Sequence, residues 1–377
     1  MTKQLNVAVI GTGFIGRVHV RSARLAGANV VGVAASNAER SAAAAASMNV
    51  PRGYATALDA VADKNVDVIH ICTPNAFHVE VAQAALEAGK HVVCEKPLAT
   101  SLKDAQMLAD LAARKGLVAT VPFVNRFHPM VREARARTQS AATGPLYLIQ
   151  GSYLQDWLLE PGDTNWRVDA AAGGASRAFA DIGSHLCDLL EWLSGDRFES
   201  LIAVLGRPIA QRAANQGRIA FQSSDDSPID TPVHTEDFAC LLARTQRGTF
   251  ATLTVSQISA GRKNRLWFEL DGAHQSVVFD SEHAEELWIG RREATSMLMR
   301  DPGQGTAEQR RLNILPPGHT QGWGDAFAAF VADSYAAIAG KAPEGLPTFA
   351  DGARSMAIVE AVLSSSASKQ WTPITSA

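Results

Sequence analysis

Cysteine is scarce in this 377-residue chain, and no two cysteines are neighbours. The four lie far apart and form no CxxC motif; they are Cys72, Cys94, Cys187 and Cys240. A fold held together by disulfide bonds is therefore excluded, and reduced thiols in a cytoplasmic protein are the simplest interpretation. The first ten residues, MTKQLNVAVI, predict a strand rather than a secretion signal.

An excess of charge of either sign is also missing. The 35 Lys and Arg residues nearly balance the 38 Asp and Glu residues, and the formal net charge is −3. So small a charge argues against a protein that binds nucleic acid or an anionic membrane surface. No apolar run approaches the roughly 20 residues that a membrane span needs. Hydrophobic residues make up 46% of the chain, which is enough for the two or three domains that its length predicts.

The first 122 residues alternate short apolar runs with alanine-rich stretches of helical composition. The apolar runs are residues 5–10, 29–35, 67–72, 91–94 and 117–122, and helices are expected after the first run through residue 25 and over 36–48, 79–88 and 101–114. Apolar strands separated by helices are typical of a parallel sheet covered on both faces. We therefore expect a doubly wound α/β domain over residues 1–122.

A different pattern begins at residue 123. After a helix over 129–138, strands are expected over 146–153, 200–204, 238–243, 248–257, 265–271 and 276–279, with few long helices between them. This order predicts a second α/β domain, residues 123–377, built on a large and mostly antiparallel sheet. Further helices are expected over 183–193, 323–339 and 350–366, and long loops over 207–235 and 291–321.

A glycine-rich turn, GTGFIG over residues 11–16, follows the first predicted strand and opens the first helix. In a dinucleotide-binding turn, Gly11 would permit the tight bend, Gly13 would let the backbone approach a pyrophosphate, and Gly16 would let helix and strand pack closely. The N–H groups of the helix N-terminus would bind the phosphates. The position predicts dinucleotide binding, while a purely structural glycine turn is the alternative.

The choice between NAD and NADP is made at the end of the second strand, where NAD-binding proteins usually carry an acidic residue. Ser36 occupies that position and is followed by Asn37 and Arg40. No acid is present there to repel a 2′-phosphate, and these three side chains can bind one. NADP is slightly favoured over NAD on this ground. Alternatively, Ser36 only caps the next helix and Arg40 is a solvated charge.

A lysine stands at the carboxyl end of the fourth strand, in the sequence Glu95-Lys96-Pro97. Ligands bind parallel sheets at that edge, and Pro97 restricts the backbone of Lys96 to extended conformations. An ammonium placed there can hydrogen-bond the oxygen of a reacting alcohol. A solvated surface lysine is the alternative interpretation.

Asp181 and His185 are four residues apart, so they share a face if a helix begins near residue 182. A histidine is a suitable base for an alcohol proton, and a neighbouring carboxylate can fix its tautomer. With Asp188, the spacing also fits a metal-binding face, but no further ligand cluster supports one, and we expect no metal. A helix-capping Asp and a buried structural His are the remaining alternative.

Three sets of residues together resemble one family. Gly11-x-Gly13-x-x-Gly16-x-x-His19, Thr73-Pro74-Asn75-x-x-His78 and Glu95-Lys96-Pro97-Leu98 are similar to motifs of the glucose–fructose oxidoreductase / inositol dehydrogenase (Gfo/Idh/MocA) family, and the segment from Asp181 to Asp188 resembles its second-domain helix. Tyr153-Leu-Gln-Asp156-Trp157 and Trp166-Arg167 are similar to the levoglucosan dehydrogenase branch. The family's usual Phe-Asn before an interdomain arginine is interrupted here, in Phe123-Val124-Asn125-Arg126.

The resemblance implies a Rossmann domain, a second domain with an open sheet, and hydride transfer between NAD(P) and a secondary hydroxyl of a sugar, anhydrosugar or cyclitol. It assigns catalysis to Lys96, Asp181 and His185. For cofactor binding it implies the turn residues Gly11, Gly13, Phe14, Ile15 and Gly16 together with Thr73, Pro74, Asn75, His78, Glu95 and Lys96, in addition to Ser36, Asn37 and Arg40. For the substrate it implies Lys96, Arg126, Tyr153, Trp166, Arg167, Asp181, His185 and Trp323.

Two other functions stay open at this point: a ligand sensor without catalysis on the same fold, and a glycosidase of the same family that regenerates its own NAD.

A large sheet with one face free of helices predicts association of copies through that face. We expect a homodimer or homotetramer, and a small-molecule sugar or cyclitol as the only other partner.

Overall fold

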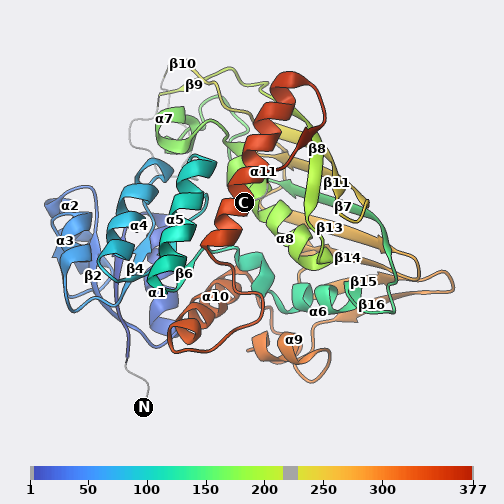
Figure 1. The fold of residues 1–377 in the computed structure, drawn as a ribbon, viewed down its shortest axis with the longest axis horizontal. Coiled ribbons are helices and arrows are strands. Elements are labelled where there is room, and N and C mark those ends of the chain that lie inside the picture. The colour runs from blue at the N-terminus through green and yellow to red at the C-terminus, as the bar shows by residue number, and fades with distance from the viewer. Residues whose placement is uncertain (1–3, 215–227, 376–377) are drawn as a thin grey trace.

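The computed structural model describes residues 4–214 and 228–375, which form two large sheets with helices packed against them (Figure 1). A six-stranded sheet uses residues up to Thr120, and a nine-stranded sheet uses residues from Leu146 onward. The expected order, a doubly wound domain followed by a domain with a large and mostly antiparallel sheet, is confirmed. The boundary between residues 122 and 123 stays a prediction.

All pairings in the first sheet are parallel, in the strand order β3-β2-β1-β4-β5-β6. The strands are β1 (Asn6–Ile10), β2 (Asn29–Ala34), β3 (Gly53–Tyr54), β4 (Val68–Ile71), β5 (His91–Cys94) and β6 (Ala119–Thr120). The helices are α1 (Phe14–Leu25), α2 (Ala38–Ser47), α3 (Ala57–Ala62), α4 (His78–Glu87) and α5 (Leu102–Lys115). The apolar central strands are buried because helices cover both faces, and the carboxyl ends of β1, β4 and β5 meet at one edge.

The second sheet has the strand order β16-β15-β14-β13-β7-β12-β11-β8-β17. Its strands are β7 (Leu146–Leu154), β8 (Phe198–Gly206), β11 (Phe238–Thr245), β12 (Phe250–Ser256), β13 (Arg265–Gly272), β14 (Ser276–Asp280), β15 (Glu286–Gly290), β16 (Thr295–Met299) and β17 (Thr372–Pro373). Only the β7/β12 pairing is parallel. The alternation of buried and exposed residues along these strands reflects a sheet with one packed face.

Helices pack against one face of this second sheet. They are α6 (Pro129–Thr138), α8 (Ser184–Ser194) and α11 (Phe349–Ser368), and no helix of the described residues covers the opposite face (Figure 1). That opposite face exposes apolar side chains on three neighbouring strands: Val204, Leu242 and Phe250 are 63%, 48% and 52% exposed. The expected open sheet face is therefore present.

Helix α10 (Trp323–Ile338) lies beside α1, although it comes from the C-terminal part of the chain (Figure 1). Phe327, Phe330 and Val331 of α10 are buried in one core with Val7 and Val9 of β1. Apolar residues that recur at this spacing line one face of a helix. The C-terminal part of the chain thus completes the core of the first domain.

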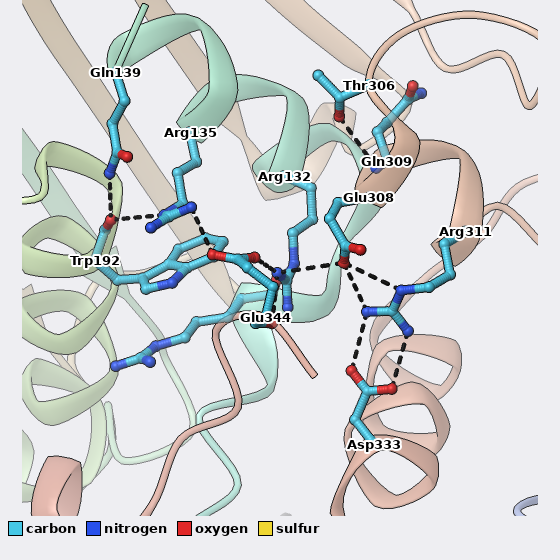
Figure 2. A network of polar contacts seen from close by, with 11 residues as sticks. Arg132, Arg135, Gln139, Trp192, Thr306, Glu308, Gln309, Arg311, Asp333 and Glu344 are labelled. Atoms are coloured by element: carbon cyan, nitrogen blue, oxygen red, sulfur yellow. Dashed lines mark hydrogen bonds and ion pairs between the residues drawn. The ribbon is translucent and has the colours of Figure 1, made fainter. Parts of the chain in front are cut away.

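Figure 2 shows a charged network that ties α10 to its neighbours. Arg132 of α6 is buried and pairs with Glu344 and, at 3.7 Å, with Glu308. Arg311 bonds to Glu308 on one side and, through two hydrogen bonds of 2.9 and 3.0 Å, to Asp333 of α10 on the other. Burial lowers the pKa of Arg132 to about 10 despite its carboxylate partners. Such a network holds α10 against the second domain because unpairing a buried charge is costly.

Two segments expected as long loops contain secondary structure. Within 207–235 lie β9 (Gln211–Ala213) and β10 (Ile229–Pro232), while residues 215–227 fall outside the described residues. Within 291–321 lie β16 and α9 (Ala307–Leu312). Composition did not reveal these strands because they are short and form by pairing with each other or with β15. The remaining short helices are η1 (Asn75–Phe77), η2 (Val124–Phe127), η3 (Trp166–Val168), α7 (Ala170–Gly173), η4 (Phe179–Gly183) and η5 (Ser281–His283).

Candidate active site

A cleft of about 940 Å³ runs from the glycine turn at the end of β1 to the packed face of the second sheet. Its lining includes most of the residues predicted for cofactor and substrate. They are Gly11, Gly13, Phe14, Ile15, Ser36, Arg40, Thr73, Pro74, Asn75, His78, Glu95, Lys96, Tyr153, Trp166, Arg167, Asp181, His185 and Trp323. Residues from both domains therefore meet around one cavity of the size that ligand sites usually have.

The glycine turn has the backbone geometry that a dinucleotide needs. Gly11 has φ +98°, and a Cβ there or on Gly16 would collide with the carbonyl oxygens of Cys72 and Gly11, respectively. A Cβ on Gly13 would instead enter open space, and no side chain caps the N-terminus of α1. The helix therefore points its N-terminus and the positive end of its dipole at the cleft, which fits a pyrophosphate.

The end of β2 presents a serine and an arginine to the cleft. Nη1 of Arg40 donates to Oγ of Ser36 at 3.2 Å, and both side chains are exposed. Asn37 does not line the cleft, because its Oδ1 accepts the backbone N–H of Arg40 at 2.8 Å and caps α2. The helix cap expected as an alternative role for Ser36 is thus provided by Asn37.

Lys96 and Asp181 form an ion pair in the cleft wall. Nζ of Lys96 donates to Oδ1 of Asp181 at 2.6 Å and to its backbone carbonyl at 2.7 Å. Arg167 lies 3.4 Å from the same oxygen, and Nε2 of Gln257 donates to Oδ2 at 2.8 Å. Burial alone would raise the pKa of Asp181, but the charges of Lys96 and Arg167 hold it well below its usual value. The carboxylate is therefore ionised and fixes the direction of the lysine side chain.

Asp181 lies within a π-helical turn, Phe179–Gly183, that leads directly into α8. We expected a helix that begins near residue 182, with the Asp181 carboxylate free to orient His185. The structure differs on both points, because the extra turn places Asp181 inside the helical segment and its carboxylate bonds to Lys96 and Gln257 instead. A π-turn widens the helix locally and often occurs at functional sites.

His185 is held by rings rather than by hydrogen bonds. It packs edge-on to Phe123, with 5.6 Å between ring centroids, and lies 6.3 Å from the Tyr153 ring. Its Nδ1 is buried and has no hydrogen-bond partner among the described residues. Burial and the nearby Lys96 ammonium lower the pKa of His185 to about 3. The imidazole is therefore neutral at physiological pH and able to accept a proton.

The loops that follow β4 and β5 are fixed by buried polar side chains. Nδ2 of Asn75 donates to the carbonyl of Gly173 at 2.8 Å. The ring nitrogens of His78 lie 2.8 Å from the carbonyl oxygen of Pro97 and 3.0 Å from that of Thr73. These bonds connect the two loops to each other and to the second domain, so the cleft edge is rigid before any ligand binds.

Aromatic side chains line the rest of the cleft. The Arg167 guanidinium lies over the Trp166 ring, 4.3 Å from its centroid, and Trp323 stacks against Phe14 at 6.5 Å. Tyr153 is buried beside His185. Aromatic faces next to polar groups suit a ligand that has both C–H faces and hydroxyls.

Arg126, predicted to bind substrate, is not among the residues that line this cleft. It is buried and makes ion pairs with Asp188 of α8 and, at 3.0 Å, with Asp351 of α11. These two carboxylates raise its pKa above the usual value, although burial opposes them. It lines a separate cavity of about 260 Å³. Its observed contacts are structural, since they connect three helical segments.

Gly16 also lies behind the cleft surface, where it packs on Gly11.

Two polar residues of the cleft, Gln155 and Asn264, were not among the predicted site residues. Nε2 of Gln155 donates to Oδ1 of Asn264 at 2.7 Å, and Trp157 Nε1 donates to Oε1 of Gln155 at 2.7 Å. All three residues line the cleft. Gln257, the second hydrogen-bond partner of Asp181, was missed as well. Gln155 and Trp157 lie in a segment noted for its resemblance, but nothing local in the sequence marks Asn264 or Gln257.

Among residues 4–214 and 228–375, no three His, Cys, Asp or Glu side chains gather as metal ligands. In the same described residues, no helix is long and apolar enough to cross a membrane.

Comparison with known proteins agrees with this architecture. Residues 5–123 match the family described as "Oxidoreductase family, NAD-binding Rossmann fold", and residues 131–278 match the "GFO/IDH/MocA C-terminal domain". The chain belongs to the Gfo/Idh/MocA oxidoreductase family. The resemblance inferred from its motifs is thus confirmed. Levoglucosan dehydrogenase of Pseudarthrobacter phenanthrenivorans is 30% identical over 99% of this chain and 98% of that protein. Glucose-6-phosphate 3-dehydrogenase of Bacillus subtilis is 24% identical and covers 94% of both chains.

Solved structures support the same relationship for this Gfo/Idh/MocA protein. Levoglucosan dehydrogenase in complex with NADH and levoglucosan superposes with a TM-score of 0.90 at 28% identity over 100% of both chains. The same enzyme with NADH and L-sorbose gives a TM-score of 0.89 at 29% identity, again over 100% of both chains.

Proposed function

We propose that this protein is an NAD(P)-dependent dehydrogenase that acts on a secondary hydroxyl of a sugar, anhydrosugar or cyclitol. The observation that carries the proposal is the arrangement of Lys96, Asp181 and His185 on one wall of a cleft whose other end is a dinucleotide-type glycine turn. The relatives named above, one of them solved with NADH and a sugar, support the cofactor and the substrate class.

The chain's own residues determine how the ligands lie. The N-terminus of α1 binds the pyrophosphate, and the wall beside the nicotinamide ribose is formed by Thr73, Pro74, Asn75, His78 and Glu95. When bound, the nicotinamide supplies the site that accepts or returns a hydride. Orienting both reactants in one rigid cleft is the protein's main contribution to the rate.

Lys96 and His185 act on the reacting hydroxyl. The Lys96 ammonium, aimed by Asp181, donates a hydrogen bond to the substrate oxygen and stabilises the negative charge that develops there. The neutral His185 imidazole accepts the hydroxyl proton at Nε2, directly or through a water, and returns it in the reverse reaction. Asp181 is a positioning residue, since its carboxylate oxygens are already bonded to Lys96 and Gln257.

The remaining cleft residues contact the rest of the substrate. Trp166 and Trp323 offer ring faces to apolar C–H groups, and Arg167 and Tyr153 offer donors to hydroxyls. Gln155 and Asn264 hold each other at the same end of the cleft and extend this set. Arg126 is left out because its donors are bonded to Asp188 and Asp351.

Cofactor preference rests on Ser36 and Arg40. Neither is acidic, so a 2′-phosphate is not repelled, and we retain the slight preference for NADP over NAD that the sequence predicts. Levoglucosan dehydrogenase is solved in complex with NADH, the non-phosphorylated cofactor. Both cofactors are therefore compared in the substrate panel.

The deciding experiment is a panel of sugars, anhydrosugars and cyclitols assayed with NAD and NADP at the nicotinamide absorbance. Net reduction with at least one substrate is expected. Hydrolysis of a glycoside without net reduction would instead assign the self-regenerating glycosidase. Binding of a dinucleotide and a sugar without either reaction would assign a sensor. The intact Lys96 and His185 favour catalysis over sensing.

A further inference from the structure

Four buried side chains form an unbroken hydrogen-bonded chain that begins at the cleft wall. Oε1 of Glu95 lies 3.1 Å from Nε2 of His19, and Nδ1 of His19 lies 2.8 Å from Nδ1 of His70. Nε2 of His70 lies 2.9 Å from the hydroxyl of Tyr335. Both histidines are fully buried, and Glu95 and Tyr335 are 8% and 7% exposed.

The four residues come from distant parts of the sequence. His19 belongs to α1, His70 to β4 and Tyr335 to α10, while Glu95 follows β5. Phe327 of α10 also packs edge-on to His19, with 4.9 Å between ring centroids. Helix α10 is fixed from its other side by the Asp333–Arg311 pair (Figure 2). The position of the Tyr335 hydroxyl is therefore determined by the packing of α10 and not by a mobile loop.

The direction of the hydrogen bonds follows from the inventory of donors and acceptors. A bond between two ring nitrogens requires a proton on one of them only. Burial and the neighbouring His19 hold the pKa of His70 well below its usual value, so His70 carries one ring proton. The Tyr335 hydroxyl makes its only hydrogen bond among the described residues with Nε2 of His70, and its proton therefore points there.

The positions of the remaining protons in this hydrogen-bonded chain are then fixed. His70 carries its proton on Nδ1 and donates it to Nδ1 of His19. His19, neutral in this arrangement, carries its own proton on Nε2 and donates it to Glu95. Every donor has one acceptor, and the sequence of donation runs Tyr335, His70, His19, Glu95. Buried networks that are fully satisfied in this way fix a single arrangement of their members.

Glu95 is the member of the hydrogen-bonded chain that lines the cleft. Its other oxygen, Oε2, accepts the backbone N–H of Lys96 at 3.1 Å. Burial opposes ionisation of Glu95, but the hydrogen bond from His19 and the charge of Lys96 lower its pKa. The carboxylate thus has a fixed orientation and a negative charge, next to the lysine proposed to bind the substrate oxygen.

We propose that Tyr335 and His70 are positioning residues of this dehydrogenase, which act through His19 to orient Glu95 and keep it ionised at the nicotinamide end of the cleft. The proposal rests on the proposed function for its consequence. A carboxylate at that place favours the positively charged oxidised nicotinamide over the neutral reduced one. The hydrogen-bonded chain should therefore strengthen binding of the oxidised cofactor relative to binding of the reduced one.

The first test needs no cofactor and no variant. Nitrogen-15 NMR of the intact protein labelled at histidine, at pH 7.5, reports which ring nitrogens carry protons. The arrangement predicts protonated Nε2 and bare Nδ1 in His19, and protonated Nδ1 and bare Nε2 in His70. A His19 that carries a proton on Nδ1 would overturn the proposal.

The second test measures the ratio of the Kd for the reduced cofactor to the Kd for the oxidised cofactor by calorimetry. Without the Tyr335 hydroxyl, His70 has no fixed tautomer, and His19 can adopt the tautomer that leaves Glu95 without its donor. The negative charge of Glu95 is then less stabilised. Tyr335→Phe should lower the ratio roughly threefold and Glu95→Gln roughly tenfold. Tyr147→Phe, which alters an exposed tyrosine on β7, should leave it unchanged.

The outcomes distinguish the positioning role of Tyr335 from the proposed function of the protein. An unchanged ratio in Tyr335→Phe, in a protein that still binds and reduces a dinucleotide, would overturn the positioning role alone. A wild-type protein that binds neither dinucleotide would overturn the proposed function instead. A loss of thermal stability without a change in the ratio or in the His19 proton would show a purely structural role and would also contradict the proposal.

Discussion

The ammonium of Lys96 lies 2.6 Å from Oδ1 of Asp181, across 85 residues of sequence and between the two parts of the molecule. Lys96 follows a strand of the first sheet, whereas Asp181 belongs to the π-turn in front of α8. The ion pair therefore joins the two domains in the wall of the cleft. Because the acid is held by Gln257 as well, the lysine presents its one remaining donor in a single direction.

Replacing His185 tests whether this residue accepts the proton of the substrate hydroxyl. In His185→Asn, kcat for oxidation of a substrate found in the panel should fall by roughly 10² to 10⁴ because the group that accepts the hydroxyl proton is gone. The residual rate should rise with pH, since hydroxide can replace the base. His283→Asn, at an exposed histidine, is the matched control. A variant at His185 with wild-type kcat and an unchanged pH profile would remove this residue from the mechanism.

Cofactor preference is tested by two substitutions at the end of β2. If Arg40 binds a 2′-phosphate, Arg40→Ala loses a charge-assisted contact worth about 1.5–3 kcal/mol, so the affinity for NADP should fall roughly ten- to a hundredfold while that for NAD stays the same. Ser36→Asp should shift the preference toward NAD because a carboxylate repels the phosphate. Equal wild-type affinities for NAD and NADP, both unaffected by Arg40→Ala, would show that Arg40 is only a solvated charge.

The uncovered face of the second sheet predicts association of copies of this chain. Val204 and Leu242 lie on neighbouring strands and point to that face. The wild-type protein at micromolar concentration should sediment as a dimer or tetramer, and Val204→Glu with Leu242→Glu should shift it toward the monomer by placing charges in the interface. Leu25→Glu, at an exposed leucine that ends α1, should have no effect on mass. A monomeric wild-type mass would contradict the prediction.

Stability should fall in mild acid because several histidines are buried in the neutral form. Burial lowers the pKa of His128 to about 4, whereas an unfolded histidine titrates near 6.5. Between these values the unfolded chain binds a proton that the native protein does not, so the free energy of unfolding decreases as the pH falls from 6.5 toward 4. At pH 5 this histidine alone accounts for about 2 kcal/mol.

His128→Asn isolates that contribution. Nδ1 of His128 accepts the backbone N–H of Met130 at the start of α6, and an asparagine oxygen can replace this acceptor. Urea unfolding at pH 7.5 and pH 5 should show a smaller loss of stability in the variant than in the wild type. The same loss in both proteins would mean that His128 is protonated in the native state as readily as in the unfolded one.

Much of the fold was predictable because its signals are local. Buried strands such as β1 are short apolar runs, and the glycines at residues 11, 13 and 16 indicate a tight turn in front of a helix. Lys96, Asp181 and His185 stand next to recognisable motifs, so the sequence places them at the cleft before their contacts are known. Arg126 lies outside the cleft lining because Asp188 of α8 and Asp351 of α11 pair with it, and no local pattern in the sequence shows these contacts.

The residues that were missed depend on pairing over long distances. Asn264 meets Gln155 because β13 lies beside β7, and Gln257 reaches Asp181 because it follows β12. Tyr335 meets His70 across 265 residues because α10 returns to the first domain. No local pattern encodes such neighbours, since each depends on how whole elements pack.

The most direct test of the central claim is the turnover of Lys96→Ala, compared with the wild type and with Lys103→Ala, a change at an exposed lysine of α5. Rates are followed at the nicotinamide absorbance, with a substrate and cofactor identified in the panel. Loss of the ammonium that stabilises charge on the substrate oxygen should lower kcat of Lys96→Ala roughly 10²- to 10³-fold, with dinucleotide binding retained and Lys103→Ala unaffected. Full turnover by Lys96→Ala on that substrate would contradict the account.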